Sequence, residues 1–264
     1  MIKSISALVL AYNEAEMLRL SLRNLKACVD EIIVVDMGST DGSVDIYNEI
    51  LTEADRVVSY PRQNLFAFGF AHPRNYGNMF ARSEWMLAVD SDELVEPDQI
   101  RALRSLDTES FRTFNITRKN YQPGGGLGLN DVGAIMASAP FTTETHRRLH
   151  LNLPTVEWKG IIHEEIWDDG ASAYATAGSV DVTLHHLNAF KTHNSAHEKQ
   201  ELYSYITLKA FAFPRFQHGT NAFWFTTYVK DNFEALVVYA NDFCDKQGLP
   251  RLERHLLDQA FQAL

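Results

Sequence analysis

The sequence predicts an α/β protein built around a parallel sheet. Through residues 5–90, apolar β-branched segments alternate with amphipathic segments of helical periodicity. Three of the apolar segments end in polar side chains. Strands that alternate with helices of this length form parallel sheets with right-handed crossovers. We therefore expect one sheet with helices on its faces.

The individual elements follow from periodicity and end signals. We expect strands over residues 5–12, 31–37, 55–61 and 84–90, and helices over residues 14–28, 43–54 and 70–83. The first helix carries Met17, Leu18, Leu22 and Leu25 near one face, at the spacing of an amphipathic helix. Serine and threonine after the second strand can cap the second helix, and Pro73 lies in the first turn of the third.

The pattern weakens after residue 104. We expect a strand at 111–121, a hairpin region at 146–154 and 158–170, and a strand at 179–190. The glycine-rich segment 122–133 does not lead from a strand into a helix, so we interpret it as a connecting loop, with an acceptor-side lid as the alternative. Helical periodicity returns at residue 195. This change predicts a domain of residues 1–194 and a helical extension of residues 195–264.

Composition disfavours several classes of function. The chain has 264 residues, 45% of them hydrophobic, and a formal net charge of −10, which disfavours nucleic-acid binding. Cys28 and Cys244 are far apart without zinc-site spacing, as expected in a reducing compartment. The apolar stretch near the amino terminus is too short for a signal peptide, and no stretch is long enough to span a membrane. We expect a soluble cytoplasmic protein.

The polar strand ends are expected to form one site. The first strand ends at Tyr12, Asn13 and Glu14, the second at Asp36, and the fourth at Asp90-Ser91-Asp92. The carboxyl ends of parallel strands meet at one edge of the sheet, where ligands bind in open α/β folds. This carboxyl edge is therefore the predicted binding site.

Asp90 and Asp92 are the candidate metal ligands. Paired carboxylates suit Mg²⁺ or Mn²⁺, whose charge would cancel their repulsion and would also hold a diphosphate. His186 ends another apolar strand beside His185, and neutral imidazole is an acceptable ligand for Mn²⁺. It is a candidate third ligand, although a lone histidine is more often a core or surface residue.

Other candidates divide between nucleotide binding and acid–base chemistry. Asp36 is expected to contact a base or ribose, with capping of the next helix as the alternative. Arg74 can pair with a diphosphate or with the strand-end acids, or form a surface ion pair. Glu164 lies with His163 after an apolar segment and can act as a general base. The alternative for this acidic segment is a solvated turn, in which case Asp131 or Glu144 becomes the candidate base.

Four segments carry a resemblance to a known family. The stretches VLAYNEAEMLRLSLRNL, DEIIVVDMGSTDGSVDI, AHPRNYG and WMLAVDSDE, in this order within residues 6–93, resemble family 2 glycosyltransferases of the GT-A fold. RRLH, VEWKGIIHEE and LHHLNAF, within residues 146–205, look like the subgroup that includes lipopolysaccharide-core glucosyltransferases. The resemblance implies a Rossmann-like mixed sheet, a nucleotide-sugar donor, most often a UDP-sugar, and inversion at the anomeric carbon.

The resemblance also implies roles for individual residues. Ala11, Tyr12 and Glu14 would line the pocket for the nucleobase and ribose. Asp36 would bond the base, and Arg74 would contact the donor.

For the later motifs, Asp90 and Ser91 would meet the ribose, and Asp92 would bind the metal. Glu164 matches the position of the base. His186 matches the histidine of a His-aromatic-Gly stretch, although here Leu187, Asn188 and Ala189 follow it.

Two other classes of function remain as alternatives. A nucleotidyltransferase would normally have a loop rich in glycine and lysine after the first strand, which this chain lacks. A silent nucleotide-sugar-binding or carbohydrate-binding protein has no need to keep Asp90, Asp92, Glu164 and His186 together. The acceptor is open among a saccharide, a lipid-linked glycan, a protein and a modified nucleobase. The aromatic segment 222–233 is expected to be a packed helix, with a membrane-surface or oligomer face as the alternative.

Overall fold

The computed structural model describes residues 1–108, 110–124, 126–173, 176–191, 193–213 and 222–262. The chain forms two compact units. The sheet unit comprises Met1–Arg62, Pro73–Glu157 and Ile166–Lys191, and the helical unit comprises Gln63–His72, Trp158–Glu165 and Thr192–Leu264. Gly125 of the predicted loop and Asn221 of the helical extension lie outside the described residues. The domain division at residue 194 stays a prediction, because compactness does not test independent folding.

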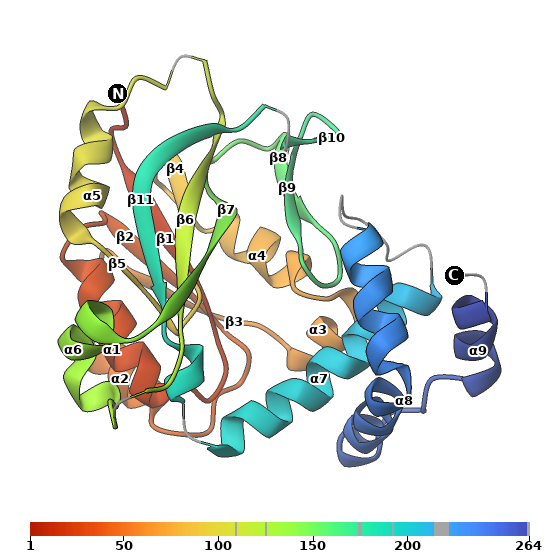
Figure 1. Ribbon diagram of the computed structural model, residues 1–264. Coiled ribbons are helices and arrows are strands. Elements are labelled where there is room, and N and C mark those ends of the chain that lie inside the picture. Colours follow the sequence, from red (N-terminus) through yellow and green to blue (C-terminus); the bar gives the residue numbers. More distant parts are fainter. Residues whose placement is uncertain (109, 125, 174–175, 192, 214–221, 263–264) are drawn as a thin grey trace. The chain divides into compact units, whose positions relative to one another are not determined.

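The strands form one large and one small sheet (Figure 1). Among the described residues the strands are β1 Ile5–Ala11, β2 Glu31–Asp36, β3 Arg56–Ser59, β4 Trp85–Ala88, β5 Glu93–Val95, β6 Thr113–Tyr121, β7 Phe141–Leu151, β8 Val156–Lys159, β9 Glu165–Asp168, β10 Ala171–Ser172 and β11 Gly178–His186. In that part of the chain the large sheet has the order β3-β2-β1-β4-β7-β6-β11-β5, and the small sheet has the order β10-β9-β8.

The described helices are α1 Ala15–Lys26, α2 Ser43–Ile50, α3 Arg62–Phe68, α4 Ala71–Asn78, α5 Pro97–Ala102, α6 Val132–Ser138, α7 His193–Ala212, α8 Ala222–Gln247 and α9 Arg254–Gln262. None of them combines the length and the apolar character that crossing a lipid bilayer requires.

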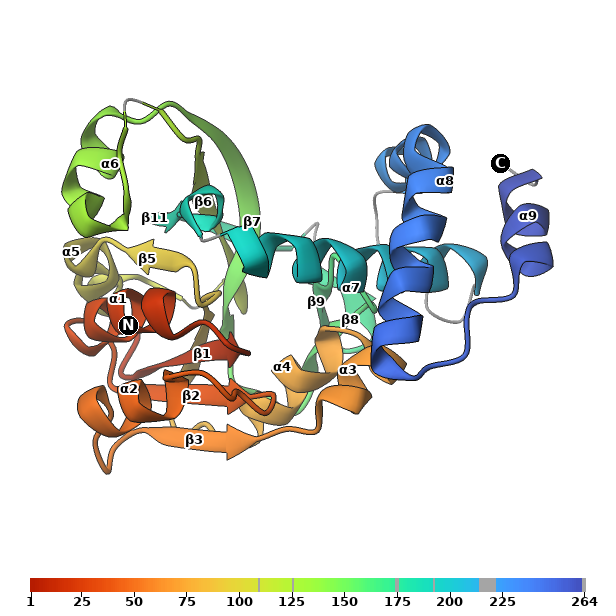
Figure 2. The same cartoon turned by 90° about the horizontal axis from the view of Figure 1, so that it is seen from below.

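The predicted α/β class is confirmed. Strands β3, β2, β1 and β4 are parallel neighbours, and Figure 2 shows β1, β2 and β3 pointing the same way. The sheet is mixed, because β7 pairs antiparallel with β4 and β6, and β5 pairs antiparallel with β11. Within 146–170, the region predicted as a hairpin, the end of β7 belongs to the large sheet, while β8 and β9 belong to the small one.

Alternation along the strands places a helix layer on each face of the sheet. Ala7 and Val9 of β1 lie in the same buried cluster as Leu18, Leu22 and Leu25 of α1. Leu8 points to the opposite face, since successive strand residues alternate. There, Gly77 of α4 lies so close to Leu8 and Val35 that an added Cβ would be 2.3 and 2.7 Å from their side chains. α4 therefore packs against the sheet through a residue without a side chain.

Aromatic side chains and one lysine hold the helical unit together. Phe243 of α8 meets Phe66 of α3 edge-on, with ring centroids 5.0 Å apart, and also packs on Tyr205 of α7 at 5.2 Å. Lys209 of α7 donates to the carbonyl of Phe66 at 2.7 Å, near the carboxyl end of α3, where unpaired carbonyls favour a cation. Phe233, in the segment predicted as a packed helix, is 5% exposed.

Replacing Gly77 with alanine tests the close approach of α4. We expect Gly77→Ala to lower the free energy of unfolding by about 1–3 kcal/mol, because the new methyl group overpacks a rigid interface. Gly133→Ala in α6 is the matched control, since its nearest neighbour would be 3.7 Å away. Urea unfolding measures both. A Gly77 variant as stable as the Gly133 variant would contradict the packing described.

Candidate functional site

The strand registers bring the predicted polar ends to one edge. Ala11 at the end of β1 pairs with Asp36 at the end of β2, and Leu8 pairs with Ala88 of β4. The backbone N–H of Val89 still donates to Leu8, at 3.0 Å, so the chain leaves the sheet just before Asp90. The residues after β1, β2 and β4 therefore share the carboxyl edge, as predicted from the sequence.

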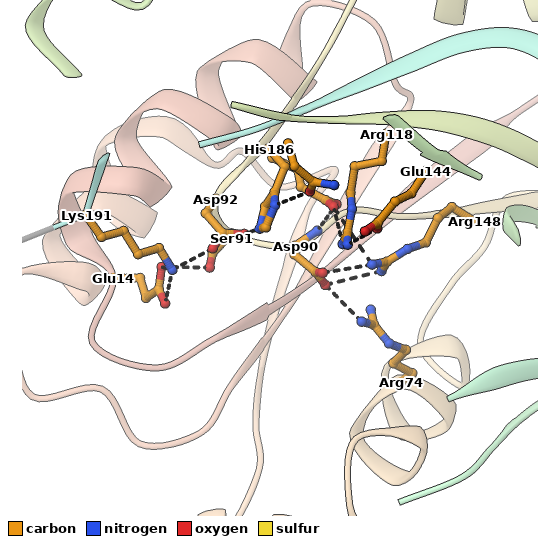
Figure 3. Close-up of polar contacts among 12 residues, drawn as sticks. Glu14, Arg74, Asp90, Ser91, Asp92, Arg118, Glu144, Arg148, His186 and Lys191 are labelled. Carbon is orange, nitrogen blue, oxygen red and sulfur yellow. Dashed lines mark hydrogen bonds and ion pairs between the residues drawn. The ribbon is translucent and has the colours of Figure 1, made fainter. Parts of the chain in front are cut away.

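Asp90 lies between two arginines (Figure 3). Arg148 of β7 donates to both carboxylate oxygens of Asp90, at 2.8 and 3.3 Å, and Arg74 of α4 donates to Oδ1 at 2.8 Å. The backbone N–H of Asp90 donates to the fully buried Glu93 at 2.8 Å. We refer to Arg74, Asp90, Glu93 and Arg148 as the arginine cluster.

The arginines fix the charge of Asp90. Burial alone would raise the pKa of this carboxyl group, but the charges of Arg148 and Arg74 outweigh burial and hold the pKa well below 3.8. Asp90 is thus an ionised carboxylate whose oxygens face guanidinium groups. Its predicted roles toward a metal and the ribose stay predictions.

Asp92 belongs to a different group of charges, the lysine cluster of Glu14, Ser91, Asp92 and Lys191 (Figure 3). The ammonium of Lys191 lies 2.5 and 2.6 Å from the two carboxylate oxygens of Glu14 and 2.7 Å from Oδ2 of Asp92. The hydroxyl of Ser91 donates to Glu14 at 3.0 Å. Residues from the segments that follow β1, β4 and β11 meet here.

His186 adds an imidazole to Asp92. Its Nδ1 lies 2.8 Å from the side-chain oxygen of Asn120, which can only accept, so Nδ1 carries the proton. In the neutral ring, Nε2 then presents a lone pair 3.5 Å from Oδ1 of Asp92. Two acceptors that face each other at this distance suit a bound cation. Asn120 orients the ring, as second partners of metal-binding histidines do.

This donor set fits a divalent ion that is held partly by substrate. No three His, Cys, Asp or Glu side chains gather as a complete ligand set in the described part of the chain. Asp92 and His186 would supply two ligands, and Mg²⁺-type sites commonly add substrate phosphate oxygens and water to one or two protein ligands. The site therefore fits an ion that arrives with a diphosphate.

His185 serves a structural role instead. It alternates with His186 along β11, so its ring points to the other face. Its Nδ1 lies 2.8 Å from the hydroxyl of Tyr121, and its Nε2 lies 2.9 Å from Glu96. Burial lowers the pKa of His185, which keeps the ring uncharged in this packed position.

Asp36 supports the loop that follows β2. Its Oδ1 accepts the backbone N–H groups of Gly38 and Ser39, both at 2.9 Å, and its Oδ2 accepts the hydroxyl of Tyr47 at 2.7 Å. Burial and the nearby Asp36 raise the pKa of Tyr47, so its hydroxyl stays a donor. Asp36 contacts α2 through Tyr47 but does not cap it, because the N-cap position of α2 is Gly42. The nucleotide contact of Asp36 stays a prediction.

The residues at the end of β1 contact neighbouring segments at the carboxyl edge. Ala11 is buried in the strand, whereas Tyr12 is partly exposed and its ring lies under the guanidinium of Arg62, 3.4 Å from the ring centroid. Asn13 has a φ of 51° and accepts the backbone N–H of Thr40 at 2.7 Å, which joins the two loops. The base-pocket roles of Ala11, Tyr12 and Glu14 stay predictions.

His163 and Glu164 belong to the helical unit. His163 is exposed and has a φ of 53°, and Glu164 is half-buried just before β9. The two alternative bases are less suitable. Asp131 caps α6 by accepting the N–H of Ala134, and Arg118 and His146 outweigh burial to lower the pKa of Glu144 to about 2, which makes it a weak base. The base role of Glu164 stays a prediction.

Sequence reasoning named Arg74, including its pairing with a strand-end acid, but missed Arg148 and Lys191. Arg148 lies within the quoted RRLH stretch, and Lys191 closes the stretch that begins at His186. The only available signal was their position beside motifs that had already been noted.

Comparison with known proteins agrees with the residues at the edge. The family model Glycosyl transferase family 2 matches residues 6–124. This stretch is similar to family 2 glycosyltransferases. The matched stretch includes Glu14, Arg74 and the Asp90–Asp92 motif, whereas Arg148, His186 and Lys191 follow it.

Curated relatives share this part of the chain. Glycosyltransferase GlyG of Streptococcus pneumoniae is 37% identical over 73 residues, which are 28% of this chain and 24% of GlyG. A TPR repeat-containing protein of Synechococcus elongatus is 28% identical over 165 residues, which are 62% of this chain and 36% of that protein. The chain spans about a third or less of the length of these relatives.

Solved structures share the fold. S. aureus TarS is 17% identical with a TM-score of 0.50, and the match covers 98% of this chain and 50% of TarS. A TarS fragment in complex with UDP is 16% identical with a TM-score of 0.50, and covers 91% of this chain and 80% of the fragment. The likeness concerns the fold, which is the GT-A arrangement of a large, mostly parallel sheet with helices.

Replacing Arg148 tests the arginine cluster. We expect Arg148→Met to lower the free energy of unfolding by about 1–3 kcal/mol at pH 7, less than the about 3–5 kcal/mol for a wholly uncompensated buried charge, because Arg74 remains. The folded pKa of Asp90 lies below its unfolded value, so its ion pairs stabilise the fold above pH 3.8. The effect of the substitution should shrink as the pH falls below 3.8 toward the folded pKa.

Urea unfolding between pH 3 and 7 measures this dependence. Arg112→Met is the control, since Arg112 is half exposed and pairs with Asp168 at the surface. An effect of Arg148→Met no larger than that of the control would contradict the assigned ion pairs.

Proposed function

We propose that the chain is a metal-dependent inverting glycosyltransferase that moves a sugar from a UDP-sugar to an acceptor hydroxyl. One observation carries this proposal. Glu14 and Asp92 of the matched stretch meet His186, the last residue of β11, and Lys191, which follows β11, at the carboxyl edge of the sheet. A nucleoside diphosphate needs cations and a metal-ligand set at one place, and this edge provides both.

Asp92 and His186 would hold Mn²⁺ or Mg²⁺. The bound ion would neutralise the departing diphosphate as a Lewis acid. The chain's own residues would bind the rest of the donor. Tyr12 and Asp36 lie at strand ends beside the cluster and would contact the base, and Arg74 would contact the diphosphate. The pairing of Arg74 with Asp90 holds its guanidinium in one orientation.

Glu164 would accept the proton of the attacking hydroxyl, with His163 as its competitor for that role. Attack from the face opposite to the departing diphosphate inverts the anomeric carbon. Positioning and charge neutralisation supply most of the acceleration, and a general base typically adds about 10²–10⁴-fold.

The subgroup of the family and the nucleobase of the donor are proposed on fewer observations. The similarity of residues 146–205 to lipopolysaccharide-core glucosyltransferases supports a saccharide acceptor. The TarS fragment, which shares only the fold, is a complex with UDP, and this agrees with the UDP-sugar that the sequence motifs imply.

Asp92→Asn tests the metal assignment. The amide keeps the size of the side chain but is a much poorer ligand, so we expect Mn²⁺-dependent UDP affinity to fall at least about tenfold while folding is retained. Asp98→Asn is the control, because the Asp98 side chain is 97% exposed on α5. Calorimetry with UDP, with Mn²⁺ and with EDTA, measures the effect. Equal UDP affinity of the Asp92 variant and the wild type in Mn²⁺ would refute the assignment.

Glu164→Gln tests the base. The substitution removes basicity and keeps size, so donor affinity should persist while single-turnover transfer slows by at least about a hundredfold. Glu165→Gln is the matched control and should be nearly silent, because neighbours on an extended segment point to opposite sides. His163→Ala tests the imidazole as the proton acceptor. Transfer that depends on Glu165 or His163 instead of Glu164 would reassign the base.

A further inference from the structure

Lys191 occupies the place in the lysine cluster where a cation is needed. Its side chain is 6% exposed, and its ammonium contacts Glu14, which is 17% exposed, and Asp92, which is 3% exposed. Burial of two carboxylates so close together is costly unless a cation joins them. Lys191 therefore stabilises the donor-free site by neutralising part of its negative charge.

The same carboxylate is also the proposed metal ligand. Lys191 contacts Oδ2 of Asp92, while Nε2 of His186 faces Oδ1 (Figure 3). An ion held by Asp92 and His186 would come beside the ammonium. Like charges this close repel strongly in a poorly solvated site, and a divalent ion doubles the repulsion of a monovalent one. Lys191 and the ion therefore cannot both contact Asp92 without strong electrostatic repulsion between them.

We propose that Lys191 is the resident cation of the donor-free site and is exchanged for the divalent ion when the donor binds. The inference rests on the proposed function, because it assumes a metal-bound nucleoside diphosphate. A lysine suits this exchange, since its ammonium is a point charge on a flexible four-carbon stem. On leaving Asp92, the ammonium keeps Glu14 and gains the diphosphate as an anionic partner.

The exchange predicts coupling between metal and nucleotide. Without nucleotide, Mn²⁺ must displace Lys191 from Asp92 with no new partner for the ammonium, so binding is weak. With UDP, the diphosphate accepts the displaced ammonium, so each ligand strengthens the other. Lys191 thus makes binding of the ion and binding of the donor cooperative.

Mn²⁺ titration of Lys191→Met tests the exchange, with free Mn²⁺ followed by electron paramagnetic resonance. Without nucleotide, we expect the variant to bind Mn²⁺ at least about tenfold more tightly than the wild type, which lies within the usual range of coupling. Lys191→Arg keeps the charge and should remain weak. Lys26→Met is the matched control, since Lys26 also pairs at 2.7 Å with a buried aspartate, Asp55, and should leave Mn²⁺ affinity unchanged.

The outcomes separate the two proposals. If the wild type binds Mn²⁺ with UDP but Lys191→Met binds Mn²⁺ alone no better than the wild type, the exchange is refuted and the proposed function stands. If the wild type binds UDP equally well in EDTA, the metal dependence itself fails. If Lys191→Met does not fold, Lys191→Gln replaces it as the neutral variant, and the same tenfold gain is required of it. A gain of equal size in Lys191→Arg would also refute competition by charge.

Discussion

The carboxyl edge depends on one constraint, the need of buried carboxylates for cations. Glu93 and Asp92 are almost completely buried, and Asp90 and Glu14 are partly so. Each has a cation within ion-pair distance, supplied by an element far away in the sequence. Such charges would otherwise shift their pKa or unfold the edge. The positions of α4, β7 and the end of β11 are therefore tied to the acids that follow β1 and β4.

Local sequence patterns predicted strands β1–β4 clearly, β7 only in part and β5 not at all. Strands β1, β2 and β4 are continuous apolar runs between helices, a local pattern typical of buried parallel strands. β5 has only three residues and β7 carries exposed polar positions over much of its length, so neither shows a clear periodicity. The pairing of β5 with β11 joins segments about ninety residues apart (184 against 95), and no local pattern reports such a contact.

The same distinction holds for the site. Asp92 and His186 could be named in advance because each is a polar residue at the end of an apolar run. Arg148 and Lys191 could not, because a basic residue beside a strand is most often a solvated side chain. Their roles arise only when the fold brings them to acids that lie more than fifty residues away in sequence (148 against 90, and 191 against 92).

The two acids of the Asp90-Ser91-Asp92 motif differ in the kind of cation that holds them. Asp90 contacts two guanidinium groups, and the planar guanidinium of Arg148 donates to both of its oxygens, which fixes their relative orientation. Asp92 has one ammonium, which is shared with Glu14 and has no preferred plane. The first arrangement fixes the chain direction where it leaves β4, while the second leaves one carboxylate that can change partners. If only Asp92 changes partners, the motif can bind an ion while Asp90 keeps its ion pairs and the edge of the sheet keeps its structure.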